Sequence, residues 1–410
     1  MELTQEVLKI AERYKTPFLL VNPSIISKNI KRIKQSIPVC PLRQSGAAGR
    51  KDIEVYYAIK ANSNSKVLEF ISNQDVGFEI SSIGELEYLL RIGVSPSRII
   101  SSNPIKETGF IKRLSELGAD FFVYDSQEEA NKIALLAPKS KVCLRLAVEN
   151  TGSQWPLARK FGVELEEAFN LLSYAKGLDL IPYGLMFHVG SQCLNKDTWL
   201  NALNRCKEVW NQATNVGMKL KILNLGGGLP IKHMKRIPDI ESIGKSISLG
   251  LRNFSASENG SRELARCDGS PSRLLIEPGR AIIGDAAIMV TSVIGKAKRR
   301  GENWLYLDVG VFTGLMETIE GFDYELVSPK SGTRKNFIVA GPTCDSVDKM
   351  FENKLLPDLG IGDKVYILNA GAYTLSYASH FNGFNPPEVY LTTDPVPPRS
   401  DGIPGGRIQI

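Results

Sequence analysis

Eight short apolar runs typical of β-strands alternate with amphipathic stretches along the chain. The runs span residues 55–59, 76–80, 98–101, 121–124, 141–146, 183–188, 222–225 and 274–276. Stretches with helical periodicity separate most of them, namely 83–92, 111–117, 126–136 and 197–216. Eight strands, each followed by a crossover segment, predict an α/β protein with a (β/α)8 TIM-like barrel. A doubly wound open sheet is the alternative, because spacing alone does not show that the sheet closes.

The pattern of predicted elements changes after residue 280. The β-rich runs there span 281–296, 304–309, 336–340, 364–368 and 388–391, with turns and no regular helices between them. They predict a second, antiparallel β domain, to which residues 18–21 can add a strand. A chain of 410 residues is also too long for one ordinary core. We therefore expect an N-terminal segment at 1–35 that contributes to the β domain, a barrel at 36–280 and a C-terminal β domain at 281–410.

Composition and charge exclude several classes of function. The chain is 43% hydrophobic and 23% charged, as expected of a soluble globular protein. Its formal net charge of +6 is small beside 50 basic and 44 acidic residues, and no basic stretch is interleaved with aromatics. No nucleic-acid partner is therefore expected. No apolar run reaches transmembrane length, so no membrane partner is expected either.

The cysteines and histidines point away from a secreted protein and from a metalloprotein. The six cysteines include no CxxC pair, and residues 1–14 read as an amphipathic helix rather than a secretory signal. Reduced thiols in a cytoplasmic enzyme are expected. The three histidines lack metal-ligand spacing, so no metal site is expected. Polar stretches at 41–52 and 254–272 predict exposed loops, and the tail from 394 predicts an extended segment.

Lys60 stands where the first apolar run gives way to a polar turn. A lysine in this position is ordinarily a solvated surface charge. The alternative is an amine that forms a Schiff base with a carbonyl cofactor, which requires a shaped, partly dry site. The surrounding strand ends decide between the two interpretations.

Barrel enzymes build their sites from loops at the C-terminal ends of the strands. Besides Lys60, Glu79 ends the second predicted strand, and residues 188–191 follow the sixth. Residues 226–228 follow the seventh, and residues 277–280 follow the eighth. Five groups of unusual residues at one end of a barrel predict a site there.

A set that we call the phosphate cup stands out among these residues. Three glycines in a row after a strand can bring bare backbone N–H groups close to an anion, although a plain tight turn has the same sequence. Arginine adds a positive charge that suits a phosphate, and a serine hydroxyl adds a donor. The cup consists of Ser191, Gly226, Gly227, Gly228 and Arg280.

Two further strand-end residues have both a structural and a chemical interpretation. His188 is either a core histidine or a ring that stacks on a flat cofactor. Glu277 either anchors a turn or faces a pyridine nitrogen, where a carboxylate keeps that nitrogen protonated and makes the ring an electron sink.

The motifs of this chain together resemble those of the fold-III pyridoxal 5′-phosphate decarboxylases, the ornithine and diaminopimelate decarboxylase family. The motifs are Tyr-Ala-Ile-Lys-Ala-Asn at 57–62, Gly-Phe-Glu at 77–79, His-Val-Gly-Ser at 188–191, Gly-Gly-Gly at 226–228, Glu-Pro-Gly-Arg at 277–280, Gly-Pro-Thr-Cys-Asp at 341–345 and Gly-Ala-Tyr-Thr at 371–374. They follow the family's order over nearly the whole chain. Residues 155–162 are similar to a segment of the bacterial ornithine branch. The resemblance implies an alanine racemase-like barrel with a C-terminal β domain.

The resemblance also implies roles for individual residues. Lys60 would bind pyridoxal 5′-phosphate covalently, His188 would stack on its ring and Glu277 would pair with the pyridine nitrogen. Glu79 would lie near Lys60, at a position where many ornithine enzymes carry aspartate. The phosphate would be bound by Ser191, Gly226, Gly227, Gly228, Gly279, Arg280 and Tyr373. Cys344 would reach the site from the partner subunit and reprotonate the substrate carbon, so a homodimer is implied.

The reaction and the substrate follow less directly from the sequence. Racemases of this fold place an arginine at the pyridine nitrogen, so Glu277 favours a decarboxylase. Asp345 is suited to bind a distal ammonium. Glu320 and Asp323 are both candidates for a second acid, and either can be a solvated loop charge. Ornithine is the expected small-molecule substrate; lysine, diaminopimelate, carboxynorspermidine or a modified diamino acid, and an inactive regulatory homologue, are the alternatives.

Overall fold

The computed structural model describes residues 1–37, 53–150, 152–155, 159–255 and 271–395. The predicted loop at 41–52 lies outside the described residues, as do most of the loop at 254–272 and the tail from 396. The chain divides into two compact units, one formed by Met1–Pro23 with Ala286–Ile410 (the β unit) and one by Ser24–Asp285 (the barrel unit). The domain boundaries that we expect after residues 35 and 280 remain predictions.

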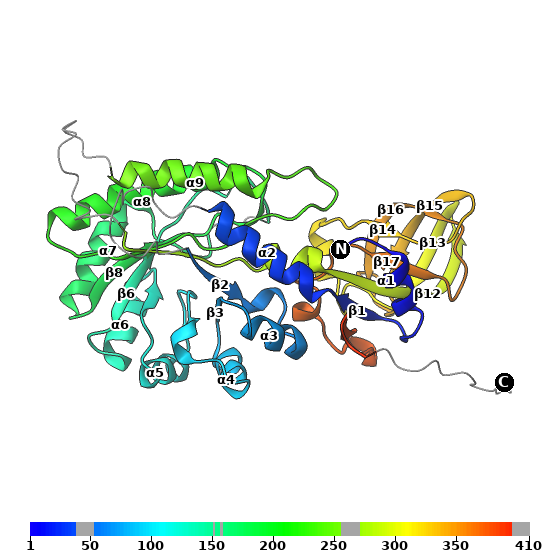
Figure 1. The fold of residues 1–410 in the computed structure, drawn as a ribbon, viewed down its shortest axis with the longest axis horizontal. Coiled ribbons are helices and arrows are strands. Elements are labelled where there is room, and N and C mark those ends of the chain that lie inside the picture. Colours follow the sequence, from blue (N-terminus) through cyan, green and yellow to red (C-terminus); the bar gives the residue numbers. More distant parts are fainter. Residues whose placement is uncertain (38–52, 151, 156–158, 256–270, 396–410) are drawn as a thin grey trace. The chain divides into compact units, whose positions relative to one another are not determined.

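The barrel unit contains a parallel sheet of eight strands (Figure 1). They are β2 (Glu54–Ala58), β3 (Gly77–Glu79), β4 (Ile99–Ile100), β5 (Phe122–Tyr124), β6 (Lys141–Arg145), β8 (Ile181–Met186), β10 (Ile222–Asn224) and β11 (Arg273–Ile276). Their order is β4-β3-β2-β11-β10-β8-β6-β5, so strands that follow one another in sequence are neighbours, except β4 and β5 at the two ends of this order, and the last strand, β11, pairs with the first, β2. A sheet wound in one direction in this way forms a barrel. The predicted TIM-like barrel is confirmed, and the doubly wound alternative is wrong.

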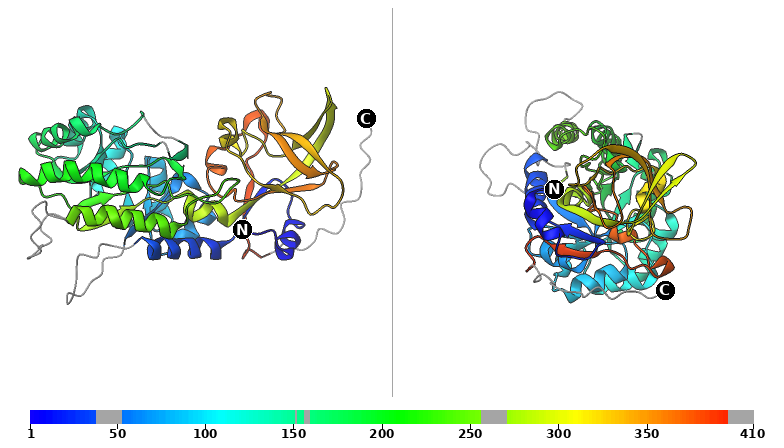
Figure 2. Two further views of the ribbon diagram at one scale, coloured as in Figure 1. Left: turned by 90° about the horizontal axis from the view of Figure 1, so that it is seen from above. Right: turned by 90° about the vertical axis from the view of Figure 1, so that its right-hand side faces the viewer.

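Helices cover the outside of the barrel unit (Figures 1 and 2). They are α2 (Pro23–Ser36), α3 (Ser65–Ser72), α4 (Ile83–Arg91), α5 (Thr108–Glu116), α6 (Gln127–Leu136), α7 (Leu165–Gly177), α8 (Thr198–Asn215), α9 (Ile240–Ser255) and the short α10 (Arg280–Ile283). Side-chain caps start several of them: Asn64, Ser82 and Ser126 accept backbone N–H groups of the first turns of α3, α4 and α6. Caps of this kind fix where each strand-to-helix loop ends.

Apolar side chains fill the barrel interior. The cluster consists of Tyr56, Ile100, Phe121, Val123, Cys143, Met186, Ile222 and Leu275. At the N-terminal ends of the strands, Arg273 donates two hydrogen bonds of 2.8 Å to the carboxylate of Glu54 and pairs with Asp120. Lys141 pairs with the same Asp120 at 3.1 Å. This network ties together the ends of three strands and the start of β5, at the opposite end from Lys60.

The β unit is a mixed eight-stranded sheet. Its strands are β1 (Phe18–Val21), β12 (Ala287–Arg299), β13 (Glu302–Leu307), β14 (Leu326–Val327), β15 (Arg334–Ala340), β16 (Lys349–Pro357), β17 (Lys364–Ile367) and β18 (Glu388–Leu391). β1 joins this sheet, paired with β12 and β18. The expectation of an antiparallel domain is only partly right, because β1 runs parallel to β18 and β13 runs parallel to β15. The long connection between β13 and β15 allows the chain to return in the same direction.

Two local expectations for the β unit are corrected. The run predicted as a strand from 281 begins as α10 and the turn η3 (Gly284–Ala286), and β12 starts only at Ala287. Gly279 and Gly284 cap this helical turn at its two ends, and both have right-handed helical backbone angles. β16 was not predicted, because charged residues at its centre obscure its alternation. The other helical elements of the β unit are α1 (Gln5–Ala11), η4 (Met316–Glu320), η5 (Leu375–Tyr377) and η6 (Phe381–Gly383), and the barrel unit also has the turn η2 (Pro96–Arg98).

Candidate active site

Lys60 lies in η1 (Ile59–Ala61), the single turn that follows β2. Its Nζ is 2.7 Å from Oε2 of Glu79 at the end of β3. The side chain of Glu79 is 2% exposed, whereas that of Lys60 is 46% exposed. The parallel register pairs Ala58 with Glu79, which brings the two strand ends side by side. Lys60 is therefore an accessible amine whose charge is balanced by a buried carboxylate.

The turn that carries Lys60 is held by its own motif. Tyr57 is fully buried, and its hydroxyl donates a hydrogen bond of 3.0 Å to the carbonyl of Asn62. The backbone N–H of Ala58 donates to the carbonyl of Pro278, 3.3 Å away. A Cβ added to Gly279 would lie 2.7 Å from the Cβ of Ala61. The Glu-Pro-Gly-Arg turn is thereby packed directly against the lysine turn.

Glu277 is a buried carboxylate that follows β11. Its Oε1 accepts hydrogen bonds from the hydroxyl of Ser102 and from Nδ2 of Asn224, the latter at 2.5 Å. Burial raises the pKa of Glu277, and the negative charge of Glu79 raises it further, against the opposing effect of Lys60. A positively charged partner beside this carboxylate would offset the effect of burial and favour its ionised form.

His188 follows β8 and is half-buried. Its Nδ1 accepts a hydrogen bond of 3.0 Å from the backbone N–H of Gly190, which places the ring proton on Nε2. Burial lowers the pKa of His188 well below its ordinary value, and the charges of Arg145 and Lys60 lower it further. The imidazole is therefore neutral, as suits a ring that stacks rather than one that carries charge.

Two glycines of the phosphate cup have backbone angles and close contacts that a residue with a Cβ could not adopt without strain. Gly226 and Gly228 have φ angles of +61° and +104°. A Cβ at Gly226 would lie 2.2 Å from the carbonyl oxygen of Phe187, and one at Gly228 would lie 2.5 Å from that of Gly190. The two strand-end loops can meet only because glycine occupies these positions.

Ser191 and Arg280 complete the phosphate cup. Nη2 of Arg280 lies 3.4 Å from Oγ of Ser191. Arg280 is 3% exposed and begins α10 directly after Gly279. Most of the predicted barrel residues thus gather at the C-terminal ends of the strands, with a cation and a hydroxyl beside bare backbone.

Gln192 is a site residue that the sequence did not single out. Its buried side-chain amide donates to the carbonyl of Ile231 at 2.5 Å and accepts the N–H of Ile231 at 3.0 Å. Its own φ angle is +57°, in the left-handed region. The N–H of Cys193 also donates to the carbonyl of Gly228, 2.9 Å away. Gln192 therefore fastens the loop of Ser191 to the loop of the three glycines.

Arg145 was also missed, although it ends the fifth strand of the barrel. It is half-buried, and burial lowers its pKa, while the charges of Glu277, Asp125 and Glu79 raise it. The strand-end rule that found Lys60 and Glu79 applies equally to Arg145 and could have found it.

The predicted residues of the β unit form a separate set, described within that unit. Cys344 is exposed, and its backbone N–H and thiol both contact Oδ1 of Asn382. Asp345 is half-buried and accepts the N–H of Val347 at 2.9 Å. Tyr373 has a φ angle of +57° and stacks on Tyr377 with ring centroids 6.1 Å apart.

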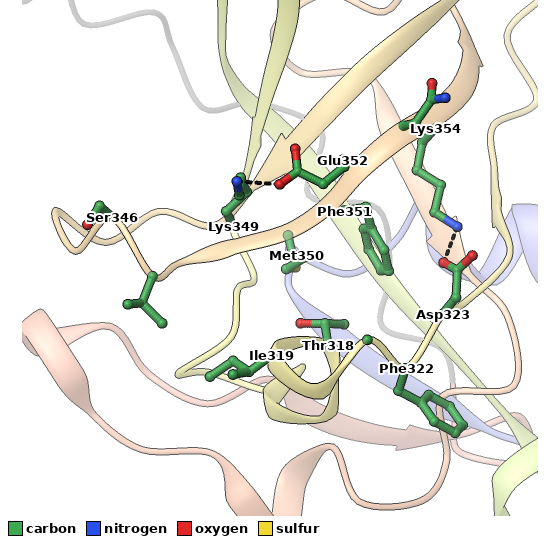
Figure 3. A pocket seen from close by; sticks show the side chains of 13 residues that line it. Thr318, Ile319, Phe322, Asp323, Ser346, Lys349, Met350, Phe351, Glu352 and Lys354 are labelled. Carbon is green, nitrogen blue, oxygen red and sulfur yellow. Dashed lines mark hydrogen bonds and ion pairs between the residues drawn. The ribbon is translucent and has the colours of Figure 1, made fainter. Parts of the chain in front are cut away.

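A cavity of about 540 Å³ lies beside this set (Figure 3). It is lined by Thr318, Ile319, Gly321, Phe322, Asp323, Ser346, Val347 and residues 349–354. Asp323 faces Lys354, with which it forms an ion pair, and Glu320 is not among the lining residues. A third acid of this loop, Glu317, is buried and accepts the hydroxyl of Tyr324 at 3.1 Å. Of the two predicted acids, Asp323 therefore lines this cavity and Glu320 does not.

Comparison with known families identifies the barrel. A family model described as "Pyridoxal-dependent decarboxylase, pyridoxal binding domain" matches residues 26–284. The chain belongs to this family. It is therefore a pyridoxal-phosphate-dependent amino-acid decarboxylase, as the motifs indicated.

Relatives of the decarboxylase cover most of its length. The lysine/ornithine decarboxylase of Selenomonas ruminantium is 32% identical over 93% of this chain and 90% of its own. The ornithine decarboxylase of Schizosaccharomyces pombe is 31% identical over 83% and 78%. The crystal structure of the Selenomonas ruminantium lysine decarboxylase has a TM-score of 0.82 at 30% identity, over 95% of this chain and 96% of that one. The arginine decarboxylase of Paramecium bursaria Chlorella virus has a TM-score of 0.81 at 29% identity, over 94% and 98%.

The barrel residues of the decarboxylase fit pyridoxal 5′-phosphate. A Cβ at Gly227 would lie 3.0 Å from Nε2 of His188, so the glycine leaves open the space beside the imidazole. An anion-binding cup, a neutral imidazole, a buried carboxylate and an accessible lysine are the groups that the phosphate, ring, pyridine nitrogen and aldehyde of this cofactor require. Bound there, the cofactor would supply an electron sink. Among the described residues, no three His, Cys, Asp or Glu side chains are placed to hold a metal ion.

Proposed function

We propose that the protein decarboxylates L-ornithine to putrescine, with Lys60 as the residue that binds the cofactor covalently. The observation that carries this proposal is the pairing of an accessible Lys60 with the buried Glu79, next to the buried carboxylate of Glu277. Relatives named ornithine decarboxylase and lysine/ornithine decarboxylase support a basic amino acid as substrate. Lysine is the second candidate, because the Selenomonas ruminantium relative is named lysine/ornithine decarboxylase.

Each barrel residue has a distinct task in this proposal. Glu79 holds the charge of Lys60 and orients its amine. His188 covers one face of the cofactor ring, and Glu277 keeps the pyridine nitrogen protonated. The cofactor's phosphate is held by Ser191, Gly226, Gly227, Gly228, Gly279 and Arg280 of the barrel unit, together with Tyr373 of the β unit.

The β-unit residues act on the substrate. The thiol of Cys344 donates a proton to the α-carbon after CO2 has left. Asp345 binds the distal ammonium, since the N–H of Val347 occupies only one of its oxygens. Asp323 is the second acid of choice, because it lines the cavity beside residues 346 and 347 and Glu320 does not.

We further propose a homodimer in the cytoplasm, with Cys344 completing the active site of the partner subunit. The exposure of Cys344 supports this arrangement, because a proton donor that serves another chain must lie at a surface. None of the helices in the described part of the chain is long and apolar enough to span a bilayer. A cross-complementation test, mixing Lys60→Ala with Cys344→Ala protein, should restore part of the activity that each variant lacks.

The role of Lys60 has a direct spectroscopic test. The purified protein should be yellow, and borohydride should abolish that absorbance and fix the cofactor to the peptide that contains Lys60. Lys60→Ala should remain colourless after gel filtration, whereas the surface variant Lys176→Ala should be yellow. Colourless wild-type protein that no added cofactor converts would favour an inactive regulatory homologue.

The substrate is decided by CO2 release from ornithine, lysine, arginine, diaminopimelate and carboxynorspermidine. Ornithine should give the highest kcat/KM. Asp345→Asn should raise KM about 10- to 100-fold with little change in kcat, since a charge-assisted hydrogen bond contributes about 1.5–3 kcal/mol. Asp323→Asn should have a larger effect on KM than Glu320→Gln. A cofactor-loaded protein that releases no CO2 from ornithine would refute the assignment.

A further inference from the structure

The buried carboxylate of Glu277 has one occupied and one open oxygen. Oε1 accepts the hydroxyl of Ser102 and, at 2.5 Å, Nδ2 of Asn224. Nδ2 of Asn224 also lies 3.4 Å from Oγ of Ser102, so the two donors and the carboxylate oxygen form a closed triangle. Two donors on one oxygen fix the rotation of the carboxylate and direct Oε2 away from them.

The two donors come from different strands of the barrel. Ser102 follows β4 and Asn224 ends β10, and both are buried, with exposures of 4% and 0%. Neither side chain belongs to the motifs that predicted the site. Most buried polar groups in proteins have a hydrogen-bond partner, and here that partner is Glu277.

Asn224 also reaches the phosphate cup. Its Oδ1 accepts the backbone N–H of Gly226 at 3.0 Å. One amide therefore connects the group proposed for the pyridine nitrogen with the first glycine of the phosphate cup. Ser102 makes no such second contact with the cup among the hydrogen bonds of the described residues.

The charged groups around Glu277 have opposing effects on its pKa. Glu79 on β3 raises its pKa, and Lys60 lowers it. The hydrogen bonds from Ser102 and Asn224 also lower it, as donors to a carboxylate do. Arg145 on β6 and the thiol of Cys143 on the same strand also interact electrostatically with the carboxylate. Ser102 and Asn224 are neutral, so they favour the ionised carboxylate without adding a competing charge.

We propose that Ser102 and Asn224 are positioning residues that hold Glu277 ionised and aim its Oε2 at the pyridine nitrogen, and that Asn224 alone also shapes the phosphate cup. This inference rests on the proposed function of Glu277. It predicts different consequences for the two residues: loss of Ser102 affects the chemistry, and loss of Asn224 affects both the chemistry and cofactor binding.

Ser102 can be tested against a matched neighbour. Ser101 is equally buried, at 3% exposed, and among the described residues its hydroxyl has no hydrogen-bond partner. Ser102→Ala should lower kcat about 10- to 100-fold, as loss of residues that orient a reactive group typically does, while KM and the dissociation constant of pyridoxal phosphate stay within about twofold. Ser101→Ala should retain wild-type values, and Ser102→Thr, which keeps the hydroxyl, should restore most of kcat.

The pH dependence separates positioning from mere packing. Removal of a donor raises the pKa of the Glu277 carboxylate. Without substrate, the change in cofactor absorbance that accompanies protonation of Glu277 should therefore occur at higher pH in Ser102→Ala than in the wild type. The acid limb of the kcat profile should move in the same direction. Asn224→Ala should show this shift and also raise the cofactor's dissociation constant about 10-fold or more. If Ser102→Ala does not fold, Ser102→Thr and Asn224→Ala carry the comparison.

Two results would overturn the proposal. One is a Ser102→Ala enzyme with wild-type kcat and an unshifted titration, and the other is an Asn224→Ala enzyme with wild-type cofactor affinity. Failure of the proposed function has a different signature, namely a wild-type holoenzyme that releases no CO2 from any basic amino acid. The substrate-free absorbance titration would still report on Ser102 in that case.

Discussion

The thiol of Cys344 lies 3.2 Å from Oδ1 of Asn382, and the same oxygen accepts the backbone N–H of Cys344 at 3.1 Å. Asn382 has a φ angle of +55°, a conformation that asparagine tolerates better than most residues. One side chain thus fixes both the backbone and the sulfur of the proposed proton donor.

Asn382→Ala should make Cys344 more reactive toward iodoacetamide. Loss of one hydrogen bond of about 0.5–1.5 kcal/mol corresponds to a roughly 2- to 10-fold faster alkylation, and kcat should fall because the thiol is no longer held in one place. The buried thiols of Cys143, Cys193 and Cys206 should stay unmodified, and mass spectrometry identifies the labelled peptide. Asn336→Ala, on an exposed position of β15 outside the cavity shown in Figure 3, serves as the control. Equal alkylation rates in all three proteins would contradict the prediction.

Gln192→Ala should weaken cofactor binding. The substitution removes both hydrogen bonds to Ile231, together about 1–3 kcal/mol, so the dissociation constant of pyridoxal phosphate should rise about 5- to 100-fold. Gln192→Gly should have a smaller effect, because glycine adopts the positive φ angle without strain. The measurement is fluorescence titration of cofactor-free protein, with Gln127→Ala as a surface control. An unchanged constant in Gln192→Ala would show that the loops are held by other contacts.

Glu277→Gln should stabilise the cofactor-free protein at high pH although it abolishes activity. The pKa of Glu277 is raised in the folded state, so the folded protein binds the proton more tightly than the unfolded chain does. Stability therefore falls as the pH rises from the unfolded pKa through the folded one, and the loss is complete above it. The glutamine variant escapes this loss, which is on the order of 3 kcal/mol for a pKa raised to about 7. Urea unfolding at pH 5 and pH 8 should show the advantage of the variant only at pH 8; an equal advantage at both would refute the electrostatic explanation.

Arg273→Ala should destabilise the barrel without slowing catalysis. Its guanidinium is 20% exposed and holds Glu54 and Asp120, at the opposite end of the strands from Lys60. Removing a mostly buried partner of two carboxylates should lower the free energy of unfolding by about 2–4 kcal/mol. The half-exposed pair of Arg32 with Glu241 provides the contrast, and Arg32→Ala should cost at most about 1 kcal/mol. A drop in kcat of Arg273→Ala at temperatures where it is folded would argue against a purely structural role.

The sequence was most informative where a strand ends. Lys60, Glu79 and His188 could be found because the period of the apolar runs locates strand ends, and barrels place their chemistry there. Ser102, Asn224 and Gln192 could not, because their roles depend on partners more than 35 positions away in the chain.

Unusual backbone conformations were the second kind of feature that could not be predicted from the sequence. The left-handed φ angle of Gln192 leaves no mark in composition, because glycine or asparagine would be the expected residue there. The turn at 281–286 was mistaken for a strand for a similar reason: its apolar residues suit a buried helix and a buried strand equally. The pairing of the β-unit strands depends on long connections, which local pattern does not describe.

The N-terminal strand β1 has a consequence for biosynthesis. Phe18–Val21 is wholly buried and finds its partners only in β12 and β18, at the far end of the chain. At ribosomal rates of about 5–20 residues per second, on the order of 10 to 50 seconds pass between the appearance of β1 and that of β12. During this interval the barrel unit emerges as a continuous stretch, while β1 lacks its partner strands and has only the preceding helix α1, with which Phe18 and Leu20 share a hydrophobic cluster. An apolar strand without its partner strands is prone to aggregation in a partly synthesised chain, so the order of synthesis makes β1 a site of that risk until β12 and β18 have been made.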